Sequence, residues 1–215
     1  MRFISSLWQR LLSPLVVDTL LILVLGLSIL TWFRGSTVIM TSASVWPLNW
    51  PMYLEKASFV WDDSIGTGHV DARQIAALPL ALVGAGLSAL GLPLSIAQHL
   101  LFYAWFAGAG LAMLFLCWVF SLPRLARVSA AVLYLISPYA LVTVWSQTDG
   151  LTMPIYMGAP LGAGLFVYVL SRQKGIVTIL LANLILLASL FSAALTNPAF
   201  AVVFSLPILL AVVGY

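Results

Sequence analysis

Two adjacent carboxylates, Asp62 and Asp63, stand in a stretch that also contains Gly66, Gly68 and His69. Carboxylate oxygens bind Mg²⁺ or Mn²⁺, and a carboxylate also serves as the general base that takes a proton from a sugar hydroxyl. The sequence therefore offers Asp62, Asp63 and His69 as metal ligands and the two acids as catalytic residues. The alternative is a solvated loop in which Asp63 caps a turn.

A third acid, Asp149, lies in a short polar segment, Ser146-Gln147-Thr148-Asp149-Gly150. If this segment and the Asp62-Asp63 pair emerge on the same side of a membrane, Asp149 can approach the pair and assist it. The alternative is a turn residue that precedes Gly150. The sequence contains no phosphate-binding glycine loop, no zinc-ligand spacing and no nucleophile elbow, so it carries no soluble-enzyme signature.

Three further polar residues interrupt apolar runs. Asp18 lies near the start of the first run, where a carboxylate is costly unless it has a partner or reaches the interface. We expect it at the membrane interface near Arg10 rather than in an ion-coupling role. Gln98 and His99 lie one turn into a later run, where a polar pair is more often a hydrogen-bonded feature of a helix interface than a ligand.

The composition indicates the kind of fold that holds these polar residues in place. The chain of 215 residues is 63% hydrophobic and 7% charged, whereas a soluble domain has roughly 25% charged residues. The net charge of +3 is spread over small clusters at the ends of apolar runs, which makes nucleic acid an unlikely partner. The sequence thus predicts an all-α protein, a polytopic transmembrane helical bundle that forms a single module over residues 1–215.

Several apolar runs are long enough to cross a hydrocarbon core of about 30 Å as helices. The expected spans are 15–33, 94–120, 128–144, 154–170, 176–194 and 199–213. A further run, 74–90, decides the topology. Three pairs of cations share one side of the membrane only if this run does not cross it, and these pairs are Arg2/Arg10, Arg124/Arg127 and Arg172/Lys174.

The positive-inside rule favours that arrangement. We therefore expect 74–90 to be a re-entrant or membrane-surface helix, ended by Gly91-Leu92-Pro93, and the N-terminus to be cytoplasmic. Residues 34–73 then form one long external loop that holds four of the six acids. Its five aromatic residues argue against disorder, and we expect a short helix over 53–61 with aromatics at headgroup depth.

The order of these segments resembles the GT-C glycosyltransferases, which are polytopic enzymes that use polyprenyl-phosphate-linked sugars. Over about residues 40 to 200, the sequence is similar to the N-terminal region of the actinobacterial arabinofuranosyltransferase D family. The motifs that carry the resemblance are Pro51-Met52-Tyr53-Leu54-Glu55-Lys56, Trp61-Asp62-Asp63, Leu90-Gly91-Leu92-Pro93 with Gln98, Ala130-Ala131, and Leu135-Ile136-Ser137-Pro138-Tyr139.

The resemblance implies an enzyme of the prokaryotic plasma membrane that serves cell wall biogenesis. It would transfer a sugar, such as arabinofuranose, from a polyprenyl-phosphate donor to a glycan acceptor outside the cell. An acid of the first external loop is the base in GT-C enzymes, so the resemblance assigns that role to Asp62 or Asp63, with Asp149 assisting. The reaction proceeds with or without a metal such as Mg²⁺ or Mn²⁺.

Members of that family are far longer, and they carry an acid where this chain has Ser44-Val45-Trp46. The chain is therefore a fragment of a longer protein, the product of a split gene or a catalytically silent relative. A second class of function is a non-catalytic membrane subunit or scaffold that packs against other membrane subunits. A third is a transporter, which ranks last because Asp18 alone among the charged residues lies within an expected span.

Overall fold

In the computed structural model, the chain is predominantly helical, as its composition predicts. The structure describes residues 14–40, 46–59, 61–62, 68–70, 77–146 and 152–172. The helical elements are α2 (Pro14–Gly26), the 3₁₀ segment η1 (Leu27–Trp32), α3 (Trp50–Ala57), α5 (Leu78–Ala89), α6 (Leu94–Val119), α7 (Arg124–Ile136), the π-helical segment η2 (Ala140–Trp145) and α8 (Thr152–Arg172). Two short strands, β1 (Trp61–Asp62) and β2 (His69–Val70), pair antiparallel.

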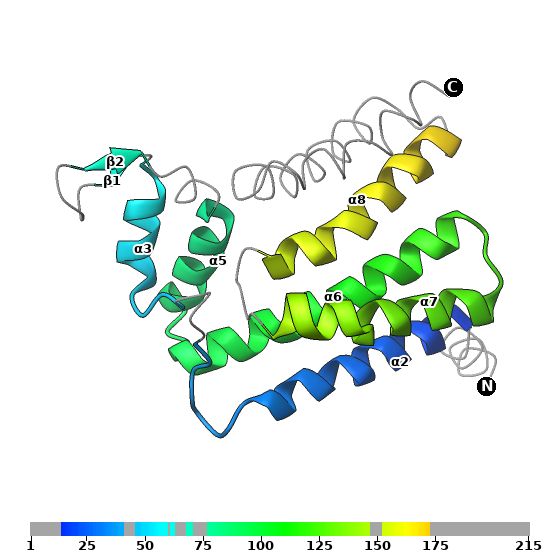
Figure 1. Cartoon of the computed structure of the whole chain (residues 1–215), viewed down its shortest axis with the longest axis horizontal. Helices are drawn as coiled ribbons and strands as arrows, with labels where there is room; N and C mark the ends of the chain where they lie inside the picture. Colours follow the sequence, from blue (N-terminus) through cyan, green and yellow to red (C-terminus); the bar gives the residue numbers. More distant parts are fainter. Residues whose placement is uncertain are drawn as a thin grey trace, which may run out of the picture.

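Helix α6 is the central element, and α2, α7 and α8 pack along it (Figure 1). With 26 residues, α6 is about 39 Å long. Glycines allow the close approach of its neighbours. A Cβ atom added at Gly110 of α6 would lie 2.7 Å from the Ile22 side chain of α2 and 2.8 Å from the Leu135 side chain of α7. Small residues at such crossings are typical of helix packing in membranes.

Two helical segments among the described residues are long and apolar enough to cross a membrane, Pro14–Trp32 and Leu94–Val119. They match the expected spans 15–33 and 94–120. The outer face of α2 carries Leu20, Leu21 and Val24, each about half exposed or more, while Ile22 is fully buried. An apolar outer face around a buried stripe is the pattern that a helix in contact with lipid requires.

The other expected segments differ in how closely they match the helices of the structure. Helix α8 covers 154–170, and α5 covers most of 74–90. The expected span 128–144 is divided, because α7 ends at Ile136 and η2 begins at Ala140. Ser137 between them has extended backbone angles, since the following Pro138 disfavours a helical conformation there. The expected spans 176–194 and 199–213 lie outside the described residues.

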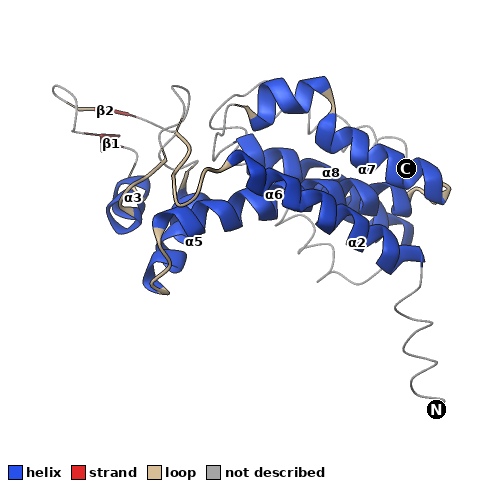
Figure 2. Cartoon of the chain, turned by 90° about the horizontal axis from the view of Figure 1, so that it is seen from below, coloured by secondary structure: helices blue, strands red, loops and turns tan. Residues whose placement is uncertain are grey.

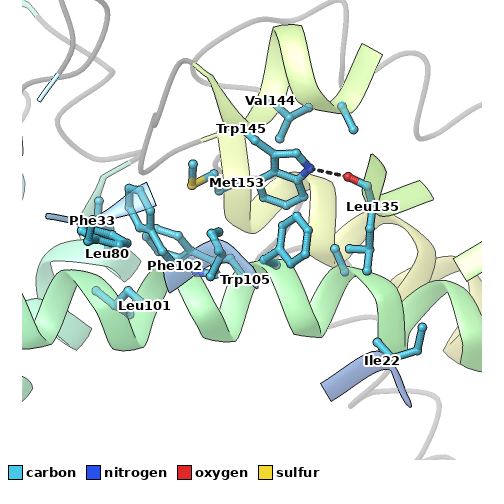
Figure 3. Packing of buried hydrophobic residues seen from close by; sticks show 14 of the residues in the cluster. Ile22, Phe33, Leu80, Leu101, Phe102, Trp105, Leu135, Val144, Trp145 and Met153 are labelled. Atoms are coloured by element: carbon cyan, nitrogen blue, oxygen red, sulfur yellow. Dashed lines mark hydrogen bonds between the residues drawn. The ribbon is translucent and has the colours of Figure 1, made fainter. Parts of the chain in front are cut away.

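The break at Ser137 returns the chain onto the bundle, where Trp145 becomes fully buried. Its indole Nε1 donates a 2.9 Å hydrogen bond to the carbonyl oxygen of Leu135, which the break leaves without a helical partner (Figure 3). The Trp145 ring also packs on Phe106 of α6 at 5.0 Å between centroids. The π-helical segment is therefore fixed to the core by its last residue.

Helices α5 and α6 end in the same way. Each is followed by a residue in the left-handed region, Gly91 with φ of 76° and Ser121 with φ of 56°. The next residue donates to the carbonyl five positions back, at 3.2 Å in the first turn and 3.1 Å in the second. A proline follows in both turns, Pro93 and Pro123, and it directly precedes the first residue of the next helix. These are Schellman ends, which satisfy carbonyls that the helix leaves open.

Candidate functional site

The described parts of the segment expected to be an external loop, 34–73, lie at one end of the bundle. Helix α3, the β1–β2 hairpin and α5 lie together at the end where η1 stops and α6 starts (Figure 1), and in the second view α3 and the hairpin extend beyond that end (Figure 2). We call this the loop end. The predicted helix over 53–61 is α3, which begins and ends about four residues earlier. Asn49 fixes its start, because its side chain accepts a 3.1 Å hydrogen bond from the backbone N–H of Met52.

The hairpin brings two of the predicted site residues opposite each other. Asp62 and His69 are direct backbone partners in the β1–β2 register. Gly68 has a φ of 85°, and an added Cβ there would lie 2.6 Å from the Trp61 ring, so only glycine fits. The side chains of Asp62 and His69, and all of Asp63 and Asp149, lie outside the described residues. Among the described residues no group of three metal-ligating side chains is present.

Aromatic side chains attach the loop to the bundle. Trp46 and Trp50 are nearly fully buried, with 2% and 3% of their surface exposed, and their rings lie perpendicular at 5.2 Å. Trp46 also meets Phe102 and Trp105 of α6 at 5.7 and 6.3 Å. The Trp50 ring lies directly over Gly84 of α5. These indoles therefore form a buried core for the loop, whereas Phe59 and Trp61 are mostly exposed.

Gln98 holds the first part of the loop against α6. Its amide group is fully buried, and it accepts a hydrogen bond from the Ile39 N–H while donating one to the Ile39 carbonyl, both at 2.8 Å. This confirms the expectation of a hydrogen-bonded interface feature for Gln98. A side chain that satisfies both backbone groups of one residue replaces the pairing that a strand would provide.

Next to Gln98, His99 stacks on Phe33 at 3.8 Å between ring centroids, and its Nδ1 lies against the Ser95 carbonyl oxygen. The ring borders a groove of about 620 Å³ between η1, the turn after it and the start of α6. The groove walls are largely apolar, and its few polar groups are close to the loop end. Its lining residues are Leu27, Leu30, Gly35, Ser36, Pro93, Ser95, Ile96, His99, Leu100 and Tyr103.

At the opposite end of the bundle, Asp18 pairs with Arg124. The expected position near Arg10 stays a prediction, because Arg10 lies outside the described residues. One carboxylate oxygen, Oδ1, accepts hydrogen bonds from Nη2 at 2.7 Å and from Nε at 2.9 Å. Asp18 is 2% exposed, and its Oδ2 has no partner among the described residues. The hydrogen bond to Asp18 and the negative charge of Asp18 raise the pKa of the Arg124 guanidinium.

Sequence reasoning missed two features of this arrangement. The groove was missed because its walls are apolar residues that look like any membrane helix. The Asp18–Arg124 pair was missed because 106 residues separate the partners. The sequence did contain one signal for it, since Asp18 and Arg124 are opposite charges that both lie beside apolar runs. Comparison with protein-family models, with curated proteins and with solved structures found no match for this chain.

Proposed function

We propose that this chain is a membrane glycosyltransferase, or the N-terminal part of one, that takes a sugar from a polyprenyl-phosphate donor and passes it to a glycan acceptor. The observation that carries the proposal is the groove beside His99. It joins a long apolar wall to a few polar groups at one end, which is the distribution that a polyprenyl phosphate has.

The groove suits a donor that arrives through the bilayer. Four of its apolar wall residues, Leu27, Leu30, Ile96 and Leu100, are between 37% and 49% exposed. A prenyl chain can therefore enter sideways from lipid and bury apolar surface, which contributes roughly 25 cal/mol per Å². Ser36, Ser95 and His99 line the end of the groove where the phosphate would lie, and the hydroxyl groups of the two serines are suitable donors to phosphate oxygens.

In this proposal the acids come from the polar segments. Asp62 belongs to the same expected loop, 34–73, as Ile39, which Gln98 fixes to the start of α6. In the proposed reaction, the acceptor hydroxyl oxygen forms a bond to the anomeric carbon as the bond from that carbon to the lipid phosphate breaks. The hydroxyl proton passes to Asp62 or Asp63, Asp149 assists, and the phosphate leaves with the electron pair. Mg²⁺ or Mn²⁺ held by Asp62, Asp63 and His69 would neutralise the departing phosphate.

The proposed function also requires a plasma membrane location. We infer that the chain crosses the membrane several times, with its N-terminus in the cytoplasm and residues 34–73 outside. The exposed apolar face of α2 and the two helical segments of spanning length support insertion. The cations at the start of α7 lie at the end of the bundle opposite the loop end, as the positive-inside rule requires.

The test is sugar transfer by the full chain reconstituted in liposomes, with a radiolabelled polyprenyl-phosphate pentose and an oligosaccharide acceptor. Asp62→Asn and Asp63→Asn each remove a carboxylate while keeping its shape, and loss of the general base lowers transfer by about 10²- to 10⁴-fold. Glu55→Gln is the matched control, because Glu55 is an exposed acid of the same loop. It should transfer at the wild-type rate.

A second pair of variants tests the groove itself. Ile96→Trp fills the groove and should raise the KM for the donor, whereas Leu82→Trp adds the same ring to an exposed position of α5 outside the groove. Full transfer in both Asp62→Asn and Asp63→Asn would reject these acids as the base. If the wild-type chain neither transfers sugar nor cross-links to a photoreactive polyprenyl phosphate, the scaffold interpretation replaces the enzyme.

A further inference from the structure

A second pocket lies at the end of the bundle opposite the loop end, and the glycosyltransferase proposal makes no use of it. It has a volume of about 310 Å³ and lies between the end of α6, the turn into α7 and the end of α8. This volume falls at the lower end of the roughly 300–1,000 Å³ typical of small-ligand sites. Its lining residues are Trp118, Val119, Ser121, Leu122, Arg127, Tyr168 and Ser171.

Arg127 brings an uncompensated charge to this pocket. Its Nε is buried and has no hydrogen-bond partner among the described residues. The neighbouring Arg124 is already neutralised by Asp18, at 2.7 Å. No carboxylate is among the residues that line the pocket in the described part of the chain. A buried guanidinium donor without an acceptor is costly, so a bound anion would stabilise this arrangement.

Ser121 is strained at the edge of the same pocket. Its φ of 56° is one that side chains other than glycine rarely adopt. The equivalent position at the end of α5 is Gly91, which makes the same turn without strain. The fold of the turn therefore does not require a serine. A strained residue that places a hydroxyl in a pocket points to a role for that hydroxyl.

Two aromatic rings line the pocket where α6 and α8 end, which is the cytoplasmic interface in the proposed topology. Trp118 and Tyr168 lie 6.0 Å apart at 34°, on helices that both end here. Trp and Tyr gather where membrane helices meet the headgroups. Basic pockets between helices on the cytoplasmic side bind anionic headgroups. The pocket combines these two rings with the buried Nε of the half-buried Arg127 and with the Ser121 side chain.

We propose that this pocket binds a phosphate group, with Arg127 as the charged donor and Ser121 as the hydroxyl donor. The hydroxyl of Ser171 already donates a 3.0 Å hydrogen bond to the Tyr168 carbonyl oxygen. A lipid headgroup and a soluble phosphate offer the same chemistry, and the two arms of the test separate them. In the first arm, the full-length protein is released from nanodiscs of phosphatidylcholine with 20% phosphatidylglycerol, and retained lipid is counted by native mass spectrometry. In the second arm, inorganic phosphate is titrated against the detergent-purified protein and thermal unfolding is followed.

Arg127→Gln should lower binding about tenfold in the arm where the wild-type protein binds, as expected for loss of one charge-assisted contact. Lys56→Gln removes one positive charge from an exposed position on α3 and should bind as the wild type does. Retained phosphatidylglycerol without a response to phosphate identifies a headgroup site. A phosphate-dependent rise in unfolding temperature without lipid retention identifies a soluble ligand.

Ser121→Gly separates a binding role from a structural one. Glycine relieves the strained φ, so the variant should unfold at a higher temperature than the wild type in the absence of ligand. It should nevertheless bind phosphate or phosphatidylglycerol more weakly, because the hydroxyl is gone. This variant also decides the matter if Arg127→Gln fails to fold. Wild-type binding by Ser121→Gly, or no binding by the wild type in either arm, overturns the proposal.

Discussion

Gln98 and Ile39 exchange two hydrogen bonds of 2.8 Å, although 59 residues separate them along the chain. The amide of Gln98 thereby fixes the segment after η1 to the first turns of α6. That segment leads to the buried tryptophans and to the hairpin, and the neighbouring His99 borders the apolar groove. One buried side chain thus joins the start of the expected loop to the helix that forms one wall of the groove.

We predict that Gln98→Leu loosens this attachment. The substitution leaves the N–H and carbonyl of Ile39 without partners in a partly buried site, which costs about 1–3 kcal/mol of unfolding free energy. Gln98→Glu keeps the acceptor but places a carboxylate in a fully buried site beside the Ile39 carbonyl oxygen, so it should cost at least as much as Gln98→Leu. Trypsin digestion of the purified protein provides the measurement, since Arg34 is exposed just before the fixed segment. Cleavage after Arg34 at the wild-type rate in Gln98→Leu would show that the two bonds do not hold the loop.

The pair formed by Asp18 and Arg124 should behave as a coupled unit. Arg124→Gln leaves the carboxylate of Asp18 buried and unpaired, so the unfolding temperature should fall. Asp18→Asn should cost less, because a neutral amide is cheaper to bury than a charge. Combining the two substitutions should recover part of the loss seen in Arg124→Gln. Thermal unfolding of the four proteins in the same detergent forms a double-mutant cycle, and strictly additive effects would disprove the coupling.

Close packing around Gly110 predicts opposite effects at two glycines. Gly110→Ala places a methyl group 2.7 Å from the Ile22 side chain and 2.8 Å from the Leu135 side chain, so α2 and α7 must shift. Such overpacking costs about 1–3 kcal/mol. Gly86 lies in the interior of α5 with nothing within 4 Å, so Gly86→Ala should stabilise the protein by about 0.5–1 kcal/mol. Equal unfolding temperatures for the two variants would contradict this account of the helix crossing.

The sequence by itself determined the helical class, the approximate limits of α2, α6 and α8, and the end of α5 at Gly91-Leu92-Pro93. These features depend on composition, on the length of apolar runs and on the backbone limits of glycine and proline, all of which act within a few residues. The sequence also marked Gln98 as a polar residue that needs a hydrogen-bonding partner, because burying an unpaired amide is costly.

Only the tertiary structure decided which groups meet. Ile39 satisfies Gln98, Arg124 neutralises Asp18, and Trp46 packs among the aromatic rings of α6. The tertiary structure also decided that the expected span 128–144 breaks at Ser137, and it decided where the groove lies. Each depends on how α6 packs against segments that are distant in the chain. Several residues could serve chemically as the partner of a given group, and only the packed structure shows which of them lies within reach.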